Sequence, residues 1–288
     1  MSNLDSMYSY RKAYLEKNIE FFLKDKPAGY QLCPTDEDKL LSYMHYHGHD
    51  CIRKIYKLLD LQDGAKVLDA GSGYAGPARF WVDQLNGTHE ITCMEVFEDT
   101  HKLAQHMTEK VVKFSKEGLE QQLKFVQDDL VTCDFSKFEE FDAIFSVLVV
   151  LHIESSKRVD LFKNLYKSLK PGGKIFLECF CFPEDASKYD NILSICGEST
   201  SFGVLPTRAE YLGHLRAAGF EVVESQDPTA SFTTFTKERH EAYLAKYETY
   251  CQFYGKELAD QSRDFMGNMY QGFLAGVEGI QILAKKPE

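Results

Sequence analysis

The pattern that most constrains this chain begins at Lys66, where short apolar runs alternate with stretches of helical periodicity. Helices are predicted at 75–85, 100–117 and 157–169. Strands are predicted at 66–71, 90–96, 123–127, 141–147, 174–180, 220–225 and 279–285. Because strands that alternate with helices form βαβ units, this pattern predicts an α/β fold with a mostly parallel sheet covered by helices on both faces. Any ligand is then expected at the carboxyl ends of the first strands.

Both ends of the chain depart from the alternating pattern. Residues 10–23 and 50–61 have helical periodicity, and a proline- and glycine-containing break at 26–38 separates them. The stretch between the last two predicted strands is largely helical, so the final strand could close the sheet antiparallel. Three parts are therefore predicted: an N-terminal helical segment over 1–60, a core over 61–226 and 273–288, and a helical cap inserted over 227–272.

Composition excludes several functions. The net charge is -11, from 44 acidic and 33 basic residues, whereas nucleic-acid-binding proteins display clustered Lys and Arg. No apolar run approaches the roughly 20 residues that span a bilayer. The first 18 residues lack the apolar core of a signal peptide. We therefore expect a cytoplasmic protein without integral membrane association or a nucleic-acid partner, either a monomer or a homodimer.

The eight cysteines are scattered and form no CxxC pair. Cys179 and Cys181 share one face of a predicted strand, but no further zinc ligands lie near them in the sequence. We therefore expect no metal site.

A glycine-rich turn follows the first predicted strand and opens a helix. Gly71 and Gly73 allow the backbone to turn tightly and to approach a ligand, and Gly76 allows close packing of helix and strand. The second strand ends in Glu95, whose carboxylate can accept both hydroxyls of a ribose. Together these features predict a nucleoside-binding site.

Two acidic positions favour one class of nucleoside ligand. Asp69 lies two residues before the first glycine, where a carboxylate would repel a pyrophosphate but can receive the ammonium of a methionine moiety. This position speaks against a dinucleotide oxidoreductase. After the third strand, an acidic side chain and a backbone N–H can meet an adenine edge. Asp129 is favoured over Asp128 for this role because it directly precedes the apolar Leu130.

Over roughly 66–180 these residues resemble the class I S-adenosylmethionine-dependent methyltransferases. The family motif D-x-G-x-G-x-G matches at Asp69, Gly71 and Gly73, and the LKPGG turn at 169–173 is a further family feature. The resemblance implies a Rossmann-like seven-stranded sheet in the order 3-2-1-4-5-7-6. It also implies S-adenosylmethionine as cofactor and S-adenosylhomocysteine as product.

The same resemblance assigns residues to each part of the cofactor. It implies contacts to the methionine part from Gly71, Ser72 and Gly73, to the ribose hydroxyls from Glu95, to the adenine from Asp129 and the Leu130 N–H, and a floor near the transferred methyl that begins at Ser146.

Two residues are candidates for catalysis. His152 follows the fourth strand, where it could act as a base, as a hydrogen-bond partner of the substrate, or as a buried packing residue. Tyr46 lies in the segment 44–49, which resembles the H-x-G segment that folds over the cofactor in small-molecule methyltransferases. The histidines of this segment also suggest metal binding, but no carboxylate or cysteine ligands occur at matching spacing.

The acceptor is expected to be a small molecule. The chain lacks the N/D-P-P-Y/F motif that marks methylation of nucleic acids and proteins in this family. Leu148 stands where related amine enzymes often carry an acidic residue or Gln. A tyrosine stripe at helical spacing could be core or an aromatic face for a cationic substrate. The stripe comprises Tyr243, Tyr247, Tyr250 and Tyr254, with Phe253 beside it.

An amine nitrogen is the first expectation for the acceptor, on the acidic charge and the aromatic cap. C-methylation of a sterol-like or other lipid or prenyl acceptor is the alternative within the same chemistry. A different class of function is a non-catalytic partner subunit that binds S-adenosylmethionine.

Overall fold

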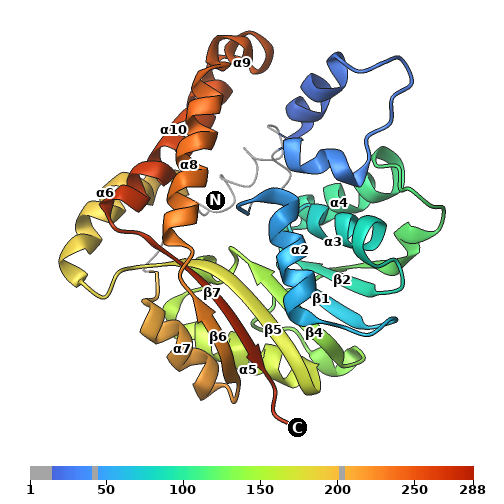
Figure 1. Cartoon of the computed structure of the whole chain (residues 1–288), viewed down its shortest axis with the longest axis vertical. Helices are drawn as coiled ribbons and strands as arrows, with labels where there is room; N and C mark the ends of the chain where they lie inside the picture. Colours follow the sequence, from blue (N-terminus) through green and yellow to red (C-terminus); the bar gives the residue numbers. More distant parts are fainter. Residues whose placement is uncertain (1–14, 41–44, 201–204) are drawn as a thin grey trace.

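The computed structural model describes residues 15–40, 45–200 and 205–288 (Figure 1). Its strands are β1 (Lys66–Ala70), β2 (Glu90–Glu95), β3 (Leu123–Gln127), β4 (Phe141–Val147), β5 (Leu169–Cys181), β6 (Glu221–Gln226) and β7 (Glu278–Lys285). Its labelled α-helices are α2 (Gly48–Leu59), α3 (Gly76–Phe80), α4 (Glu98–His106), α5 (Arg158–Ser168), α6 (Tyr189–Thr200), α7 (Arg208–Ala217), α8 (Thr229–Leu244), α9 (Tyr247–Tyr254) and α10 (Lys256–Ala275). Residues 15–24 are also helical.

The strands form one seven-stranded sheet in the order β3-β2-β1-β4-β5-β7-β6. The pairs from β3 to β5 are parallel, whereas β7 runs antiparallel to both β5 and β6. The predicted Rossmann-like fold and its strand order are confirmed. The antiparallel end arises because α8, α9 and α10 carry the chain back over the sheet before β7 enters between its neighbours.

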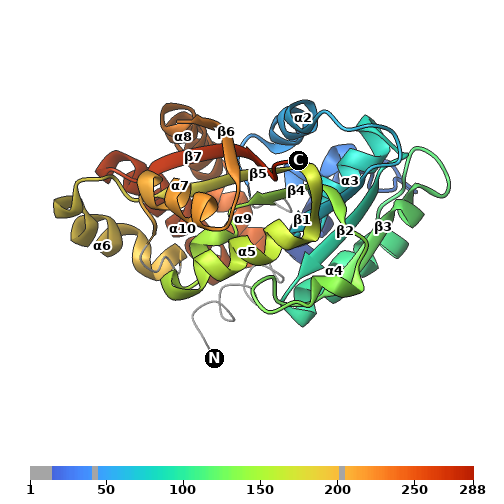
Figure 2. The same ribbon diagram turned by 90° about the horizontal axis from the view of Figure 1, so that it is seen from below.

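Helices cover both faces of the sheet, with α2 and α3 on one side and α5 on the other (Figure 2). On the α2 side, the single tryptophan, Trp81, is fully buried and stacks on Phe145 of β4 at a centroid distance of 5.5 Å. On the α5 side, Leu161, Phe162 and Leu165 pack into a second apolar cluster. The central strands are therefore buried on both faces, which explains their nearly continuous apolar sequences.

Two segments outside the sheet and its covering helices lie beyond the carboxyl ends of the parallel strands. Figure 1 shows the arm formed by α8, α9 and α10 on one side and the N-terminal segment on the other, both beyond the carboxyl ends of the parallel strands. The arm overlaps the predicted cap, and residues 15–40 belong to the predicted N-terminal segment. The division of the chain into separate domains stays a prediction.

Two predicted boundaries were wrong, and one short helix was not predicted. The helix expected over 100–117 ends earlier, because α4 passes into a π-helical turn at Met107–Val111 and Val112 then forms a β-bridge with Leu32. The strand expected at 174–180 begins at Leu169, since the glycine turn of LKPGG continues the pairing with β4 through a register shift. Within the expected break at 26–38, a 3₁₀ helix forms at Pro34–Leu40.

Candidate functional site

The glycine turn is fastened to the end of β2. The N–H groups of Gly71 and Ser72 both donate to the carbonyl of Met94, at 3.0 and 2.9 Å. Gly71 and Gly73 have φ values of +82° and +53°, in the left-handed region that favours glycine. A Cβ placed on Gly73 would have no heavy atom within 4 Å, so the backbone there is open to a ligand.

Glu95 joins the two turns at the carboxyl ends of β1 and β2. Its side chain is 5% exposed, and its two oxygens accept the N–H groups of Gly73 and Phe97, each at 3.0 Å. Burial raises the pKa of this carboxyl, and the backbone N–H groups oppose that rise. Because a carboxylate oxygen can accept two hydrogen bonds, each oxygen retains capacity for a ribose hydroxyl.

Asp69 has a buried oxygen that lacks a hydrogen-bond partner among the described residues. The residue is 4% exposed, and Oδ2 has no hydrogen-bond donor within the described parts of the chain. Burial and the nearby Glu95 raise the pKa of Asp69 well above its ordinary value. An unpartnered buried carboxylate is costly, and a ligand ammonium would satisfy it. This orphaned oxygen fits the methionine part of the expected cofactor.

The loop after β3 is shaped by its own acidic residues. Asp129 Oδ1 accepts the Val131 N–H at 2.9 Å, and Asp128 Oδ1 accepts the Asp129 N–H at 2.8 Å. From α5, the Asn164 amide donates to the carbonyls of Leu130 and Cys133 at 3.0 and 2.9 Å. Asp129 is half-buried and Asp128 is exposed. The adenine-binding role of Asp129 and Leu130 stays a prediction.

The end of β4 carries a strained residue that the sequence did not reveal. Ser146 is buried, and its hydroxyl donates to the Ala70 carbonyl at 2.9 Å, which fixes β4 to β1. Leu148 follows with φ +58°, uncommon for a non-glycine residue. This conformation places Val149 against Gly71. Strain of this kind is typical of functional sites, but a leucine gives no sequence signal for it.

His152 lies just beyond, at the end of a short 3₁₀ helix at Val150–His152. Its N–H donates to the Val149 carbonyl at 2.9 Å, and its ring is half-buried. The structure therefore places His152 just beyond the carboxyl end of β4, in the segment that follows Ser146. Its chemical role stays a prediction.

Tyr46 is buried in an aromatic cluster that joins the N-terminal segment to the sheet and the arm. Its ring is 2% exposed and lies 5.4 Å from Phe180 of β5, 4.9 Å from Phe232 and 5.1 Å from Phe235 of α8, between centroids. Phe273 of α10 lies 6.1 Å away. We name this set the Tyr46 cluster: Tyr46, Phe180, Phe232, Phe235 and Phe273.

The positively charged Arg239 lies at the edge of the Tyr46 cluster. The guanidinium carbon of Arg239 lies 5.3 Å from the Tyr46 ring centroid and 5.4 Å from that of Phe235. Both distances are within the range of cation–π attraction. Arg239 could not be singled out from the sequence, because Lys237, Glu238 and Arg239 look like a solvent-exposed helix face.

The histidines around Tyr46 have packing and hydrogen-bonding partners. His49 stacks on Phe80 at 3.8 Å, and the His47 ring bonds the Ser231 hydroxyl at 2.9 Å. His45 is hydrogen-bonded to the Gly48 carbonyl, and burial lowers its pKa to about 4. In the described ranges no group of three or more His, Cys, Asp or Glu side chains is arranged to hold a metal. Met44, which begins the predicted segment, lies outside those ranges.

The tyrosine stripe forms a separate cluster toward the tip of the arm. Tyr243 stacks on Tyr250 and Tyr250 on Tyr254, while Phe21 of the N-terminal helix contacts Tyr250 and Phe253. The Tyr254 hydroxyl donates to Asn18. The stripe therefore holds the arm against the N-terminal helix, which is the packing alternative of the sequence analysis.

A buried acid on β5 was not anticipated. Glu178 is 1% exposed, and one of its oxygens accepts from Gln281 of β7 and from the Cys51 thiol of α2. The other oxygen, Oε1, has no donor in the part of the chain described. Lys54 reaches Gln281 rather than the acid itself, at 2.6 Å. Burial raises the pKa of Glu178 to about 7.

Replacing Glu178 by Gln is expected to stabilise the protein at alkaline pH. Between pH 4.5, the ordinary pKa of Glu, and pH 7, the folded protein keeps a proton on Glu178 that the unfolded chain has released. The free energy of unfolding therefore falls as the pH rises through this range. Glu178→Gln should therefore raise the free energy of unfolding by about 3 kcal/mol at pH 8.5, and far less at pH 5. Urea unfolding at both pH values measures this, with Glu248→Gln on exposed α9 as control. An equal change at both pH values would contradict the prediction.

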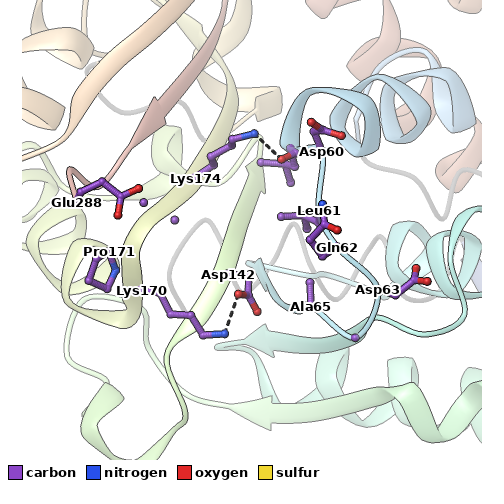
Figure 3. Close-up of a pocket in the computed structure, with 14 residues that line it drawn as sticks. Asp60, Leu61, Gln62, Asp63, Ala65, Asp142, Lys170, Pro171, Lys174 and Glu288 are labelled. Carbon is purple, nitrogen blue, oxygen red and sulfur yellow. Dashed lines mark hydrogen bonds and ion pairs between the residues drawn. The ribbon is translucent and has the colours of Figure 1, made fainter.

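A cavity of about 490 Å³ lies at the amino ends of the parallel strands (Figure 3). Its walls are the 59–65 loop, the LKPGG turn, Asp142 and Glu288. Lys170 is paired with Asp142, and Lys174 donates to the Leu59 carbonyl. Because β1 and β4 begin here, this cavity is far from the carboxyl ends where Gly71 and Glu95 lie. It is not the predicted cofactor site.

None of the helices in the described ranges combines the length and apolar character that crossing a membrane requires.

Comparison with known proteins identifies relatives of this chain. The sequence model of the mycolic acid cyclopropane synthetase family matches residues 37–282. Phosphoethanolamine N-methyltransferase 3 of Arabidopsis thaliana is 26% identical over 239 residues, which are 81% of this chain and 44% of that protein. This chain thus spans less than half the length of that relative.

Two solved structures share the fold. Phosphoethanolamine N-methyltransferase 2 of Haemonchus contortus, in complex with phosphomonomethylethanolamine and S-adenosylhomocysteine, has a TM-score of 0.71 at 17% identity. The match covers 88% of this chain and 57% of that one. The cyclopropane synthase MmaA2 from Mycobacterium tuberculosis has a TM-score of 0.70 at 15% identity, over 97% and 98% of the two chains.

The family match confirms the methyltransferase family predicted from the glycine turn and the LKPGG motif, and with it S-adenosylmethionine as the cofactor. The chain belongs to the mycolic acid cyclopropane synthetase family, which consists of S-adenosylmethionine-dependent methyltransferases.

Proposed function

We propose that this chain transfers the methyl group of S-adenosylmethionine to the amine nitrogen of a small acceptor. The observation that carries the proposal is the buried Asp69 oxygen, which has no donor in the described ranges and lies near Glu95, just before the open glycine turn. A carboxylate, an accessible backbone and a second carboxylate are what the ammonium, the methionine backbone and the ribose of the cofactor require. When bound, the cofactor supplies an electrophilic methyl group.

The chain's own residues position the acceptor and exclude water. Methyl transfer is an in-line displacement, so catalysis consists mainly of orientation and desolvation. The Tyr46 cluster is a buried packing of aromatic rings from the N-terminal segment, β5 and the arm, and the acceptor would lie next to it. An amine needs no strong base, only delivery in its neutral form. We assign Tyr46 and His152 to hold that amine, with the cap over 227–272 enclosing the site.

Arg239 narrows the class of acceptor. Its positive charge beside the Tyr46 and Phe235 rings opposes an acceptor that is permanently cationic. It favours an amine whose molecule also carries an anionic group. The phosphoethanolamine methyltransferases among the relatives are named for an acceptor of this kind. We further propose that the protein acts in the cytoplasm, as a monomer or homodimer.

C-methylation of a lipid-like acceptor is the second candidate. The five aromatic rings of the Tyr46 cluster favour it, and so does a family named for mycolic acid. In that case the reaction would need a general base, and we assign that role to His152, which follows β4.

The test is release of S-adenosylhomocysteine against amines with and without an anionic group, and against sterols. Turnover of anionic amines supports the proposal, and turnover of sterols moves the function to the second candidate. Tight cofactor binding without turnover on either would identify a non-catalytic binding subunit.

Tyr46→Phe sharpens this test, because it keeps the ring in the cluster and removes only the hydroxyl. We expect kcat to fall on the order of tenfold to a hundredfold, with the Kd for S-adenosylmethionine unchanged. Tyr250→Phe, in the outer stripe, is the matched control and should retain full kcat. A Tyr46→Phe enzyme as active as the control would remove Tyr46 from the catalytic site.

A further inference from the structure

A buried ion pair joins the N-terminal segment to α3, the helix that follows the glycine turn. Glu37 and Arg79 are both 0% exposed. The two Glu37 oxygens accept from Nε and Nη2 of Arg79, at 2.7 and 2.6 Å. This bidentate geometry fixes the angle between the two side chains as well as their distance.

The same guanidinium reaches a third element. Its Nη1 donates to the Thr108 hydroxyl at 3.0 Å and to the Ala104 carbonyl at 3.4 Å. Arg79 belongs to α3, which begins where the glycine turn ends, and Ala104 belongs to α4, which begins three residues after Glu95. One side chain therefore joins the N-terminal segment to the two helices that follow the cofactor turns.

Helix α3 also contacts the chain on the other side of Tyr46. Phe80, the neighbour of Arg79, stacks on His49 with 9° between the ring planes. Glu37 precedes Tyr46 in the sequence and His49 follows it. Two adjacent residues of α3 therefore hold the chain before and after Tyr46.

We propose that Glu37 and Arg79 are positioning residues, whose ion pair sets the place of Tyr46 relative to the glycine turn. Burying two charges is costly, and well-packed apolar side chains often stabilise a fold as well or better. Stability alone therefore does not require this pair. Apolar packing would not fix the relative orientation of the N-terminal segment, α3 and α4, whereas the directional hydrogen bonds of Arg79 do. The proposal rests on the proposed function for its kinetic readout only.

The test is the double variant Glu37→Met/Arg79→Met, which removes both charges and keeps side chains of similar reach. It should fold with a Tm close to that of the wild type, checked by the fluorescence of the single, buried Trp81. We expect kcat to fall on the order of tenfold to a hundredfold. Amide hydrogen exchange over residues 45–50 should become faster. The exposed pair on α4, changed as Glu98→Met/Lys102→Met, is the control and should alter neither.

Arg79→Lys covers the case in which the double variant does not fold, since it keeps the charge but not the fork. A folded Arg79→Lys with lower kcat and faster exchange over 45–50 supports the proposal. Wild-type kcat and exchange in either folded variant would overturn it. If the wild type turned over no acceptor, the proposed function would fail alone, because hydrogen exchange would still report whether the pair holds this segment.

Discussion

Gly71→Ala is expected to unfold the glycine turn and abolish cofactor binding. The residue has φ +82°, and an added Cβ would lie 2.9 Å from one methyl group of Val149 and closer still to the other. Val149 cannot move away from Gly71 easily. The backbone of the preceding Leu148 is strained, and the Val149 carbonyl accepts the His152 N–H. The strained backbone and the collision together should cost about 2 to 5 kcal/mol of unfolding free energy.

Gly73→Ala provides the matched comparison. Its φ is also positive, but the added Cβ would meet no heavy atom within 4 Å. We expect a stability cost of only about 1 kcal/mol. The same methyl group would occupy space that a ligand needs, so the Kd for S-adenosylmethionine should still rise on the order of a hundredfold.

Thermal unfolding without ligand and calorimetric titration with S-adenosylhomocysteine separate the two effects. Gly71→Ala should lose stability and binding together, whereas Gly73→Ala should lose mainly binding. Equal destabilisation by the two substitutions would show that the collision with Val149 does not govern the turn.

Asp69→Asn should produce opposite effects on stability and on binding. In the protein without ligand, the buried Oδ2 lacks a donor in the described ranges, so removing its charge should raise the free energy of unfolding. The same change removes the partner of the ligand ammonium. Loss of one member of a buried charge pair should weaken S-adenosylmethionine binding on the order of a hundredfold.

The pH dependence follows from the direction of the pKa shift. Burial and Glu95 raise the pKa of Asp69 above its ordinary 3.8. Between 3.8 and the raised pKa, the folded protein keeps a proton that the unfolded chain has released. The ligand-free protein therefore loses stability as pH rises through this window, and the stability advantage of Asp69→Asn should grow with pH.

Binding of the cofactor's ammonium requires ionised Asp69, so binding should release a proton. Titration calorimetry in two buffers of different ionisation enthalpy measures that release, and Asp69→Asn should abolish it. Asp99→Asn, at an exposed position in the first turn of α4, is the control for loss of an acidic side chain outside the site. An Asp69→Asn protein that is both less stable and proton-releasing would refute this account of the buried carboxyl.

The alternation of strands and helices was enough to predict a mostly parallel sheet, and the resemblance to the class I methyltransferases implied its strand order. Periodicity reflects which face of each element is buried, and this is a local property of the sequence. The glycine turn and Glu95 were predictable for a similar reason, because each lies at the end of a strand and parallel strands bring their ends together. The helix expected over 100–117 failed because a β-bridge to Leu32, far away in the sequence, overrides local helical preference.

The features with the greatest consequence for function depend on contacts between distant segments. The role of Arg79 in joining three elements becomes visible only in the fold, where Glu37 and Ala104 reach it from two other elements. Arg239 and Tyr46, and likewise Glu178 and Cys51, meet across long sequence separations. A sequence pattern shows which side chains are available and which face of an element they occupy. Only packing removes water from around a charge. That desolvation decides whether Asp69 and Glu178 hold a proton. It also decides whether the Glu37–Arg79 pair can fix three elements in place.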